Sequence, residues 1–244
     1  MTTGWYLPLA AFVALAALER ASAFRGGASH RGSRADHLLN LAGLAIQGAV
    51  IPVAGFLIAT RVLAVHFPQL AGTLAIGWWG AFLLNFVVVD LLYYLQHRAF
   101  HRVGALWALH RCHHAAPDVN VWATSRNSLA INFLFVYLLV NPVLGFLCDR
   151  PDAFFLGAAL TAALDLWRHS RVPERYAPAW LGRVLVTPAH HHLHHGADGR
   201  DANFGANLMF WDRLFGTARE PRGYPAKYGI PDAPGPWRQF LFPW

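Results

Sequence analysis

The chain has 244 residues, the size of one ordinary domain, and we expect a single domain over residues 1–244. It is 55% hydrophobic and only 14% charged, against about 25% charged residues in soluble proteins. This composition argues against a typical soluble domain and indicates an integral membrane protein. The net charge of +7 is almost wholly arginine, and these arginines flank apolar segments, so lipid headgroups explain them better than nucleic acid does.

Uncharged segments close to the 20 or so residues of a membrane helix recur along the chain. They are residues 5–18, 41–60, 71–89, 127–147 and 153–164, of which the first and last are short. We therefore expect an all-α integral membrane bundle of four or five transmembrane helices, the last two turning as a hairpin at Cys148–Pro151. No Lys or Arg precedes the first segment, so it matches a cleaved signal peptide poorly.

The four loops between these segments and the stretch after the last segment differ in charge. Two of the loops and that final stretch are rich in arginine, whereas the other two loops carry only Arg61 and Arg150. The positive-inside rule then puts the histidine-rich segments and the C-terminus in the cytoplasm, and the N-terminus on the opposite side. We expect a bacterial inner membrane protein with a cytoplasmic helical cap. The tail from Glu220 on, rich in Pro, Gly and aromatic residues, predicts an irregular cap or an interfacial strap.

Three histidine boxes follow these apolar segments. His97 and His101 are four residues apart, so on a helix they lie about 40° apart on one face. Gly104 is expected to interrupt that helix. The next box has the spacing i, i+3, i+4, and comprises His110, His113 and His114. The third box repeats this spacing with His191, His194 and His195. Each box is predicted to gather its imidazoles on one helical face.

Other residues near the boxes have different expected roles. His190 and His192 lie about 100° to either side of His191 on a helix, and they are expected to tolerate substitution better than the ligands. His169 follows the last apolar segment. Asp90 and Asp165 lie seven and four residues before His97 and His169 on the same helical faces, and they are candidates for accepting a ring N–H and orienting the ring. The remaining histidines are scattered: His30, His37 and His66.

So many clustered imidazoles would repel one another if charged, and binding metal ions keeps them neutral. Cys112 points away from its box on a helix, so a structural zinc site built on thiolates is not available. Only three glutamates occur, which excludes a carboxylate-bridged di-iron bundle, and a haem would need fewer axial ligands. Eight or nine neutral nitrogens suit two borderline metal ions, and non-haem iron is the one that activates dioxygen.

The chain resembles the fatty acid hydroxylase superfamily, also called the sterol desaturase family, whose members are membrane-bound, histidine-rich di-iron enzymes. The resemblance covers about residues 81–217. It is carried by "DLLYYLQHRAFH", "HRCHH" and "TPAHHHLHHGADGRDANFGANLMFWDRLFGT". Where many relatives read H-S-N, this chain has Arg171 as the third residue, which leaves the role of that position open.

The resemblance implies nine metal ligands: His97, His101, His110, His113, His114, His169, His191, His194 and His195. It implies two non-haem iron ions. We expect that zinc can replace iron in purified protein, because imidazole also binds zinc well. The resemblance also implies an oxidoreductase of the monooxygenase type that uses dioxygen and an external electron donor to hydroxylate or desaturate a lipid. The sequence does not name the lipid or the donor, and it does not choose between hydroxylation and desaturation.

The alternative is a membrane protein that binds or transports metal without catalysis. Transport favours ionisable groups inside the spans, because these mark an ion path. The predicted spans contain amides but no acid before Asp90. The enzyme interpretation is therefore favoured.

Overall fold

The computed structural model describes residues 6–21, 32–133, 136–178, 180–196, 201–231 and 233–241. Within these ranges it contains helices and isolated β-bridges but no β-strand, which confirms the predicted all-α fold. The α-helices are α1 (Tyr6–Arg20), α2 (Arg34–Ala45), α3 (Ile51–Leu57), α4 (Ala64–His66), α5 (Gly77–Leu83), α6 (Asp90–Arg102), α7 (Gly104–His114), α8 (Asn141–Leu147), α9 (Pro151–His169), α10 (Pro188–His195), α11 (Met209–Leu214) and α12 (Pro236–Leu241).

Short helical segments of other types join or separate these helices. The π-helical segments are Ile46–Val50, Ile58–Leu63, Leu84–Val89 and Val136–Val140. The 3-10 segments are Pro68–Leu70, Val121–Ala123, Ala130–Phe133, Glu174–Tyr176 and Leu181–Arg183. The first two π-helical segments join α2, α3 and α4 into one continuous helix, and the third joins α5 to α6.

Three helices among the described residues are long and apolar enough to cross a membrane: Arg34–His66, Gly77–Arg102 and Ala130–Leu147. They contain the predicted segments 41–60, most of 71–89 and most of 127–147. The second helix starts at Gly77, later than predicted. Gly72 and Gly77 adopt positive φ angles, which interrupt a right-handed helix, so residues 71–76 do not join it. Helix α1, with 15 residues, is about 22 Å long, less than the roughly 30 Å of a hydrocarbon core.

The first long helix begins at a capping box. The Ser33 hydroxyl accepts the backbone N–H of Asp36 at 3.2 Å, and the Asp36 carboxylate accepts the N–H of Ser33 at 2.9 Å. These two bonds satisfy donors that the first helical turn leaves without partners. The Asp36 carboxylate also lies 2.8 Å from the Arg126 guanidinium, so the start of α2 is tied to the loop that follows α7.

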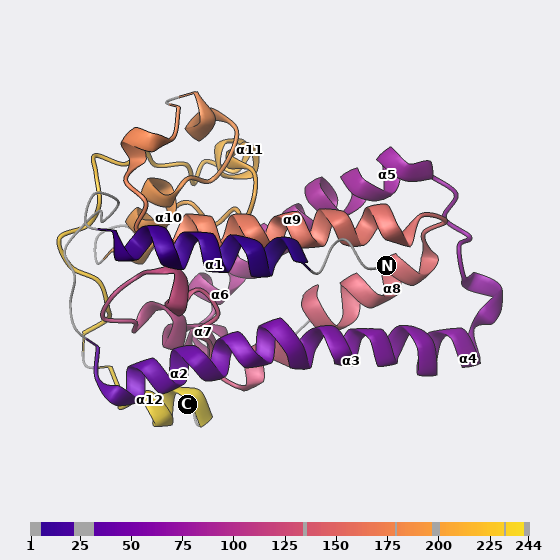
Figure 1. Ribbon diagram of the computed structural model, residues 1–244, viewed down its shortest axis with the longest axis horizontal. Helices are drawn as coiled ribbons and strands as arrows, with labels where there is room; N and C mark the ends of the chain where they lie inside the picture. Colours follow the sequence, from indigo (N-terminus) through magenta and orange to yellow (C-terminus); the bar gives the residue numbers. More distant parts are fainter. Residues whose placement is uncertain are drawn as a thin grey trace.

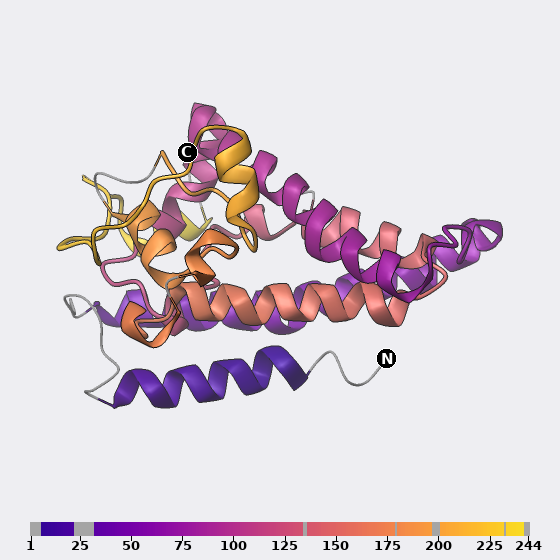
Figure 2. The same cartoon turned by 90° about the horizontal axis from the view of Figure 1, so that it is seen from above.

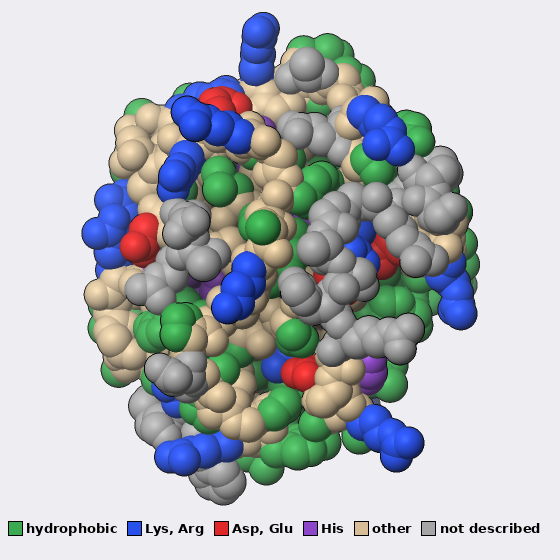
Figure 3. All heavy atoms as spheres, turned by 90° about the vertical axis from the view of Figure 1, so that its left-hand side faces the viewer, with side chains coloured by type: hydrophobic (Ala, Val, Ile, Leu, Met, Phe, Trp, Pro, Cys, Tyr) green, Lys and Arg blue, Asp and Glu red, His purple; other side chains and the backbone are tan. Residues whose placement is uncertain are grey.

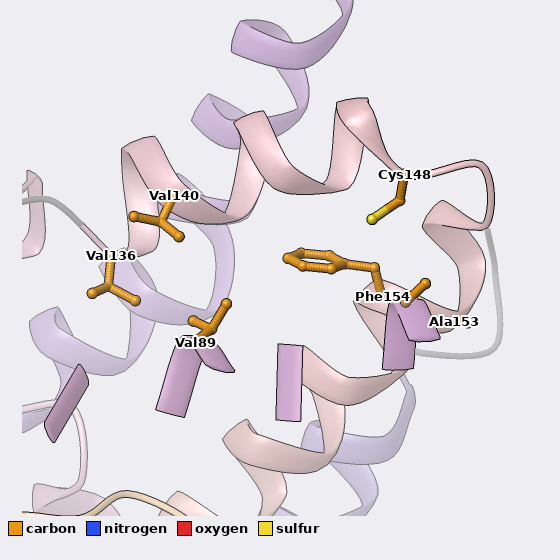
Figure 4. Packing of buried hydrophobic residues seen from close by; sticks show 7 residues of the cluster. Val89, Val136, Val140, Cys148, Ala153 and Phe154 are labelled. Atoms are coloured by element: carbon orange, nitrogen blue, oxygen red, sulfur yellow. The ribbon is translucent and has the colours of Figure 1, made fainter. Parts of the chain in front are cut away.

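The end of the bundle opposite the histidines is closed by the predicted hairpin. The chain turns at residues 148–150 between α8 and α9, and the Asp149 carboxylate accepts the backbone N–H groups of Ile76 and Gly77 at the start of α5. Buried Phe154 and Cys148 lie in one apolar cluster with Val89 and Val140 (Figure 4). This packing fixes α5, α8 and α9 against one another and sets the direction in which α6 and α9 reach the other end.

Helices α1, α9 and the continuous α2–α4 helix run along the long axis, and α6, α7, α10, α11 and α12 gather at one end (Figure 1). We call this end the cap. Viewed from above, α1 lies on the outside of α9 (Figure 2). Between α6 and α7 the backbone of Val103 is extended, with φ −108° and ψ 116°. The predicted interruption at Gly104 is therefore confirmed, with Val103 making the break.

Candidate metal centre

The cap brings all nine predicted ligand histidines together in two neighbouring groups. One group, which we call the five-histidine cluster, is made of His97, His101, His110, His114 and His194. The other, the four-histidine cluster, is made of His113, His169, His191 and His195. Within each cluster, one ring nitrogen per residue lies within 4.8 Å of all the others. Each cluster could therefore hold one metal ion.

Helices α7 and α10 each contribute to both clusters. On α7, His110 and His114 are four residues apart and enter the five-histidine cluster, whereas His113 enters the other. On α10 the arrangement is reversed, because the pair His191 and His195 enters the four-histidine cluster and His194 enters the other. The i+4 residue lies about 40° from the first residue, while the i+3 residue lies about 60° away on the other side. One helix can thus serve two metal positions, rather than the single face that the spacing predicted.

The distances between ring nitrogens match those of ligands around one ion. His191 Nε2 lies 2.9 Å from His169 Nε2 and 3.1 Å from His195 Nε2. In the other cluster, His97 Nε2 lies 3.1 Å from His110 Nε2. Two imidazole nitrogens bound about 2.1 Å from a metal ion at a right angle are about 3 Å apart. The rings therefore fit ions held between them.

Hydrogen bonds on the far sides of the rings decide where the protons are. His113 Nδ1 donates to the carbonyl of Arg126 at 3.0 Å, and His169 Nδ1 donates to the carbonyl of Asp165 at 2.8 Å. Because a carbonyl oxygen only accepts, the neutral rings keep their hydrogen on Nδ1 and a lone pair on Nε2. These two Nε2 atoms approach to 3.3 Å. Two lone pairs at this distance repel each other, and a cation between them turns the repulsion into coordination.

The five-histidine cluster is supported in the same way. His97 Nδ1 donates to the carbonyl of Phe204 at 2.8 Å, and His194 Nδ1 donates to the carbonyl of Ala202 at 2.7 Å. Their Nε2 atoms then present lone pairs to the cluster. The Nε2 atoms of His194 and His114 are buried, and among the described residues neither has a hydrogen-bond partner. Buried acceptors without partners are costly, so these atoms also fit a metal ion.

Burial keeps the rings neutral. It lowers the pKa values of His110, His114, His191 and His195 well below the ordinary histidine value, and the neighbouring histidines lower them further. Burial lowers the pKa of His194 to about 3. Neutral imidazole is the form that binds metal ions, so the rings are in the state required for coordination at neutral pH.

One of the two candidate orienting carboxylates contacts its histidine. Asp165 Oδ1 lies 3.0 Å from His169 Nδ1 and 2.6 Å from Arg168 Nη2. The Arg168 side chain is 1% exposed, and it also donates to the carbonyl of Ala206. The ring N–H of His169 donates to the backbone carbonyl of Asp165, so the carboxylate adds a charge contact to the ring, and Arg168 balances that charge.

Asp90 is not placed as expected. Its carboxylate accepts the backbone N–H groups of Asn207 at 2.8 Å and Leu208 at 3.1 Å. The ring N–H of His97 goes instead to the carbonyl of Phe204. The reason is that the chain after α10 returns over α6 and offers backbone groups to both residues. Asp90 therefore positions the segment that carries the acceptor of His97.

Two further features of this returning segment were not predicted as supports of the site. Asn203 has a positive φ of 57°, which turns the chain at the N-F-G motif. The Asp212 carboxylate then accepts the N–H groups of Phe204 and Gly205, both at 2.8 Å. These contacts place the Phe204 carbonyl against His97. The motifs were visible in the sequence, but their spacing does not reveal a backbone acceptor.

The remaining histidines lie outside both clusters. His190 Nδ1 lies 2.8 Å from the Thr187 hydroxyl, and its Nε2 lies 3.4 Å from the Glu220 carboxylate. His192 is buried on the side of α10 that faces the tail. His37 and His66 are exposed and far along the chain from the boxes. His30 lies outside the described residues.

Arg171, the departure from the family pattern, is also outside the clusters. Its backbone N–H donates to the Glu19 carboxylate at 2.8 Å, and its guanidinium lies 3.7 Å from the Asp118 carboxylate. The same Glu19 oxygen accepts the N–H of Val121 at 3.0 Å. Burial raises the pKa of Glu19 to about 7. This position joins α1 to the two loops that border the four-histidine cluster.

The part of the chain that carries both clusters matches a known family. The model of the family described as fatty acid hydroxylase matches residues 82–217. Alkylglycerol monooxygenase of Xenopus tropicalis is 34% identical over 142 residues, which are 57% of this chain and 30% of that protein. Alkylglycerol monooxygenase of Homo sapiens is 32% identical over 142 residues, with the same 57% and 30% coverage.

A bacterial relative covers more of the chain. Ornithine lipid hydroxylase OlsE of Rhizobium tropici is 32% identical over 203 residues, which are 77% of this chain and 56% of that protein. The chain therefore spans about a third of the length of the alkylglycerol monooxygenases and about half that of the ornithine lipid hydroxylase. No solved structure matches the chain.

Proposed function

Because this chain belongs to the fatty acid hydroxylase family, we propose that it is a membrane-bound, dioxygen-dependent lipid hydroxylase or desaturase with two non-haem iron ions. The observation that carries the proposal is the division of nine histidines, eight of them buried, into two clusters at one end of membrane-length helices. The five-histidine cluster would hold one ion and the four-histidine cluster the other. Reduced iron supplies the capacity to activate dioxygen for attack on an unactivated C–H bond.

The chain's own residues would prepare the site for this chemistry. Backbone carbonyls fix the tautomers of His97, His113 and His194, so each ring presents its Nε2 lone pair without reorganisation. Burial of the rings excludes water, which prevents loss of reactive species to solvent. The position of the site beside the spans lets a lipid keep its tail in hydrocarbon while one carbon reaches the metal ions.

The substrate class follows from the setting. A site at the end of membrane helices favours a lipid over a water-soluble substrate, and the relatives carry names of lipid or fatty acid enzymes. An external electron donor is required, because two clusters of histidine nitrogens bind metal but store no further electrons. We place the protein in a bacterial inner membrane.

We also propose that the cap faces the cytoplasm. Exposed Lys and Arg side chains are distributed over the surface of this end (Figure 3). They include Arg102, Arg183, Arg213, Arg219, Arg222 and Lys227. The opposite end carries Arg61 and Arg150. This asymmetry matches the positive-inside rule.

Lipid analysis of cells with and without the protein tests the function. Cells that express the wild-type chain should contain a lipid that has gained one oxygen atom or lost two hydrogen atoms. Cells that express His191→Ala should lack it, because that variant loses a nitrogen of the four-histidine cluster. Identical lipids in all three strains, with iron bound to the wild-type protein, would favour a protein that binds metal without catalysis.

A further inference from the structure

The C-terminal tail reaches the candidate metal centre through one hydrogen-bonded chain. The Tyr228 hydroxyl lies 2.6 Å from His192 Nδ1, and His192 Nε2 lies 3.0 Å from the carbonyl of Ser170 and 3.2 Å from that of His169. His192 is 0% exposed and Tyr228 is 5% exposed. Tyr228 lies beyond residue 217, where the family match ends.

The partners fix every proton in this chain. Both groups facing Nε2 are carbonyl oxygens, which only accept, so a neutral His192 carries its hydrogen on Nε2. Nδ1 is then an acceptor, and the Tyr228 hydroxyl is its donor. Tyr228 thus selects the tautomer of His192, and His192 donates to two backbone carbonyls at once.

These carbonyls stand at the end of helix α9. Helix α9 ends at His169, and the last carbonyls of a helix have no partner inside it. The His192 ring supplies the missing donor from the neighbouring helix α10. It therefore fixes the backbone of His169, the residue whose Nε2 lies 2.9 Å from His191 Nε2 and 3.3 Å from His113 Nε2.

We propose that His192 and Tyr228 are positioning residues of the four-histidine metal position: Tyr228 sets the tautomer of His192, and His192 holds the end of α9 so that His169 meets its partners. The inference rests on the proposed function, because it requires that this cluster binds an ion. It assigns a role to His192, one of the two additional histidines of the third box, and to a tail residue outside the matched region.

The tail offers a matched control. The Tyr224 hydroxyl donates to the carbonyl of Val172 at 2.5 Å, and its ring also packs edge-on against His192, at 4.7 Å. Tyr224→Phe and Tyr228→Phe each remove one hydroxyl from the same C-terminal tail. If the tail only needs to be attached to the cap, the two variants should bind metal equally well. If the tautomer of His192 matters, Tyr228→Phe should bind metal more weakly than Tyr224→Phe.

The test is zinc binding to metal-free, full-length protein in detergent, measured by competition with a chelator and by elemental analysis. Wild type and Tyr224→Phe should bind two ions per chain. Tyr228→Phe should keep one ion and bind the other about 10- to 100-fold more weakly. His192→Leu should do the same, and His192→Gln, whose amide both donates and accepts, should recover most of the affinity.

Each other outcome overturns the inference. Equal binding by Tyr228→Phe and wild type would show that the hydroxyl is not needed. Equal loss of both ions in Tyr224→Phe and Tyr228→Phe would point to detachment of the tail. Equal defects in His192→Leu and His192→Gln would show that the hydrogen bonds of His192 do not support the site. A wild-type chain that binds no ion would overturn the proposed function as well.

Discussion

Single histidines in the cap are held in defined tautomers by groups far away in the sequence. The carbonyl of Arg126 fixes His113, and the carbonyl of Phe204 fixes His97. The gathering of the rings at one site could be predicted from the sequence, because imidazoles at i, i+3 and i+4 lie within about 100° of one another around a helix. The acceptors could not, since any residue type can present a backbone carbonyl.

His191 provides the sharpest test of a single ligand. Its Nε2 lies within 3.1 Å of the Nε2 atoms of His169 and His195, and no carboxylate or thiolate of the described residues belongs to its cluster to replace it. His191→Ala should therefore abolish turnover and remove one metal ion per chain. His37→Ala, at an exposed position, should leave both unchanged. Elemental analysis of the two variants gives the bound metal, and a product assay gives the turnover. A fully active His191→Ala protein would contradict the ligand assignment.

Asp165 contacts a ligand histidine, whereas Asp90 contacts the backbone, so variants of the two should differ. Asp165→Asn removes the negative charge that lies 3.0 Å from His169 Nδ1, so it should reduce metal affinity by about 10-fold or more. Asp90→Asn weakens two bonds that hold the 207–208 backbone, so it should lower the thermal stability of the cap more than metal affinity. Chelator competition and thermal unfolding of both variants give the comparison. Equal metal affinity in Asp165→Asn and wild type would leave Asp165 as an ordinary helix-end residue.

Helices α7 and α10 show why the spacing of a box identifies ligands but not their partners. Each helix sends its i, i+4 pair to one cluster and its i+3 histidine to the other. That choice depends on where α6 and α9 bring their own histidines, which the extended residues Val103 and Ser170 at the ends of these helices determine. The sequence therefore predicts the set of nine, whereas the division into five and four needs the packing of four helices.

Helix α2 packs closely against the loop that follows α7, and Gly43 lies at this contact. A Cβ atom added to Gly43 would lie 2.1 Å from the backbone oxygen of Ser125, next to the residue whose carbonyl holds His113. Gly43→Ala should cost about 1–3 kcal/mol of stability and weaken metal binding at the four-histidine cluster. Gly48→Ala, on the same long helix with nothing within 4 Å, is the control. Thermal unfolding and metal titration of the pair test this, and equal behaviour would mean that the contact between α2 and the loop is unimportant.

The architecture of the whole molecule separates membrane-length helices from a polar cap. The alternation of uncharged segments with arginine and histidine segments was enough to predict this separation. Uncharged apolar segments favour the bilayer, and charged segments favour its surfaces. The fold of the tail was not predictable in detail. It contains a short helix, Pro236–Leu241, and a bridge between Tyr228 and Gly196. Its partners lie in segments remote in sequence, and a Pro- and Gly-rich segment has no periodicity that would reveal them.

The orientation of the molecule gives a prediction at this scale. Arg150→Cys puts a thiol in the turn between α8 and α9, and Lys227→Cys puts one in the tail on the cap. The two should react with a membrane-impermeant thiol reagent from opposite sides of the membrane. The wild-type chain, whose Cys112 and Cys148 are both buried, gives the background. Labelling of both positions from the same side would contradict the proposed topology.

The central claim is that two histidine-bound iron ions use dioxygen to oxidise a lipid. The most direct measurement supplies iron-loaded protein in lipid bilayers with a reductant and isotopically heavy dioxygen, and follows the lipids by mass spectrometry. If the enzyme hydroxylates, one heavy oxygen atom should enter the product; if it desaturates, two hydrogen atoms should be lost and the heavy oxygen should appear in water. Both results should vanish in His191→Ala. Unchanged lipids with two iron ions bound, reductant consumed and several lipid classes offered would contradict the claim.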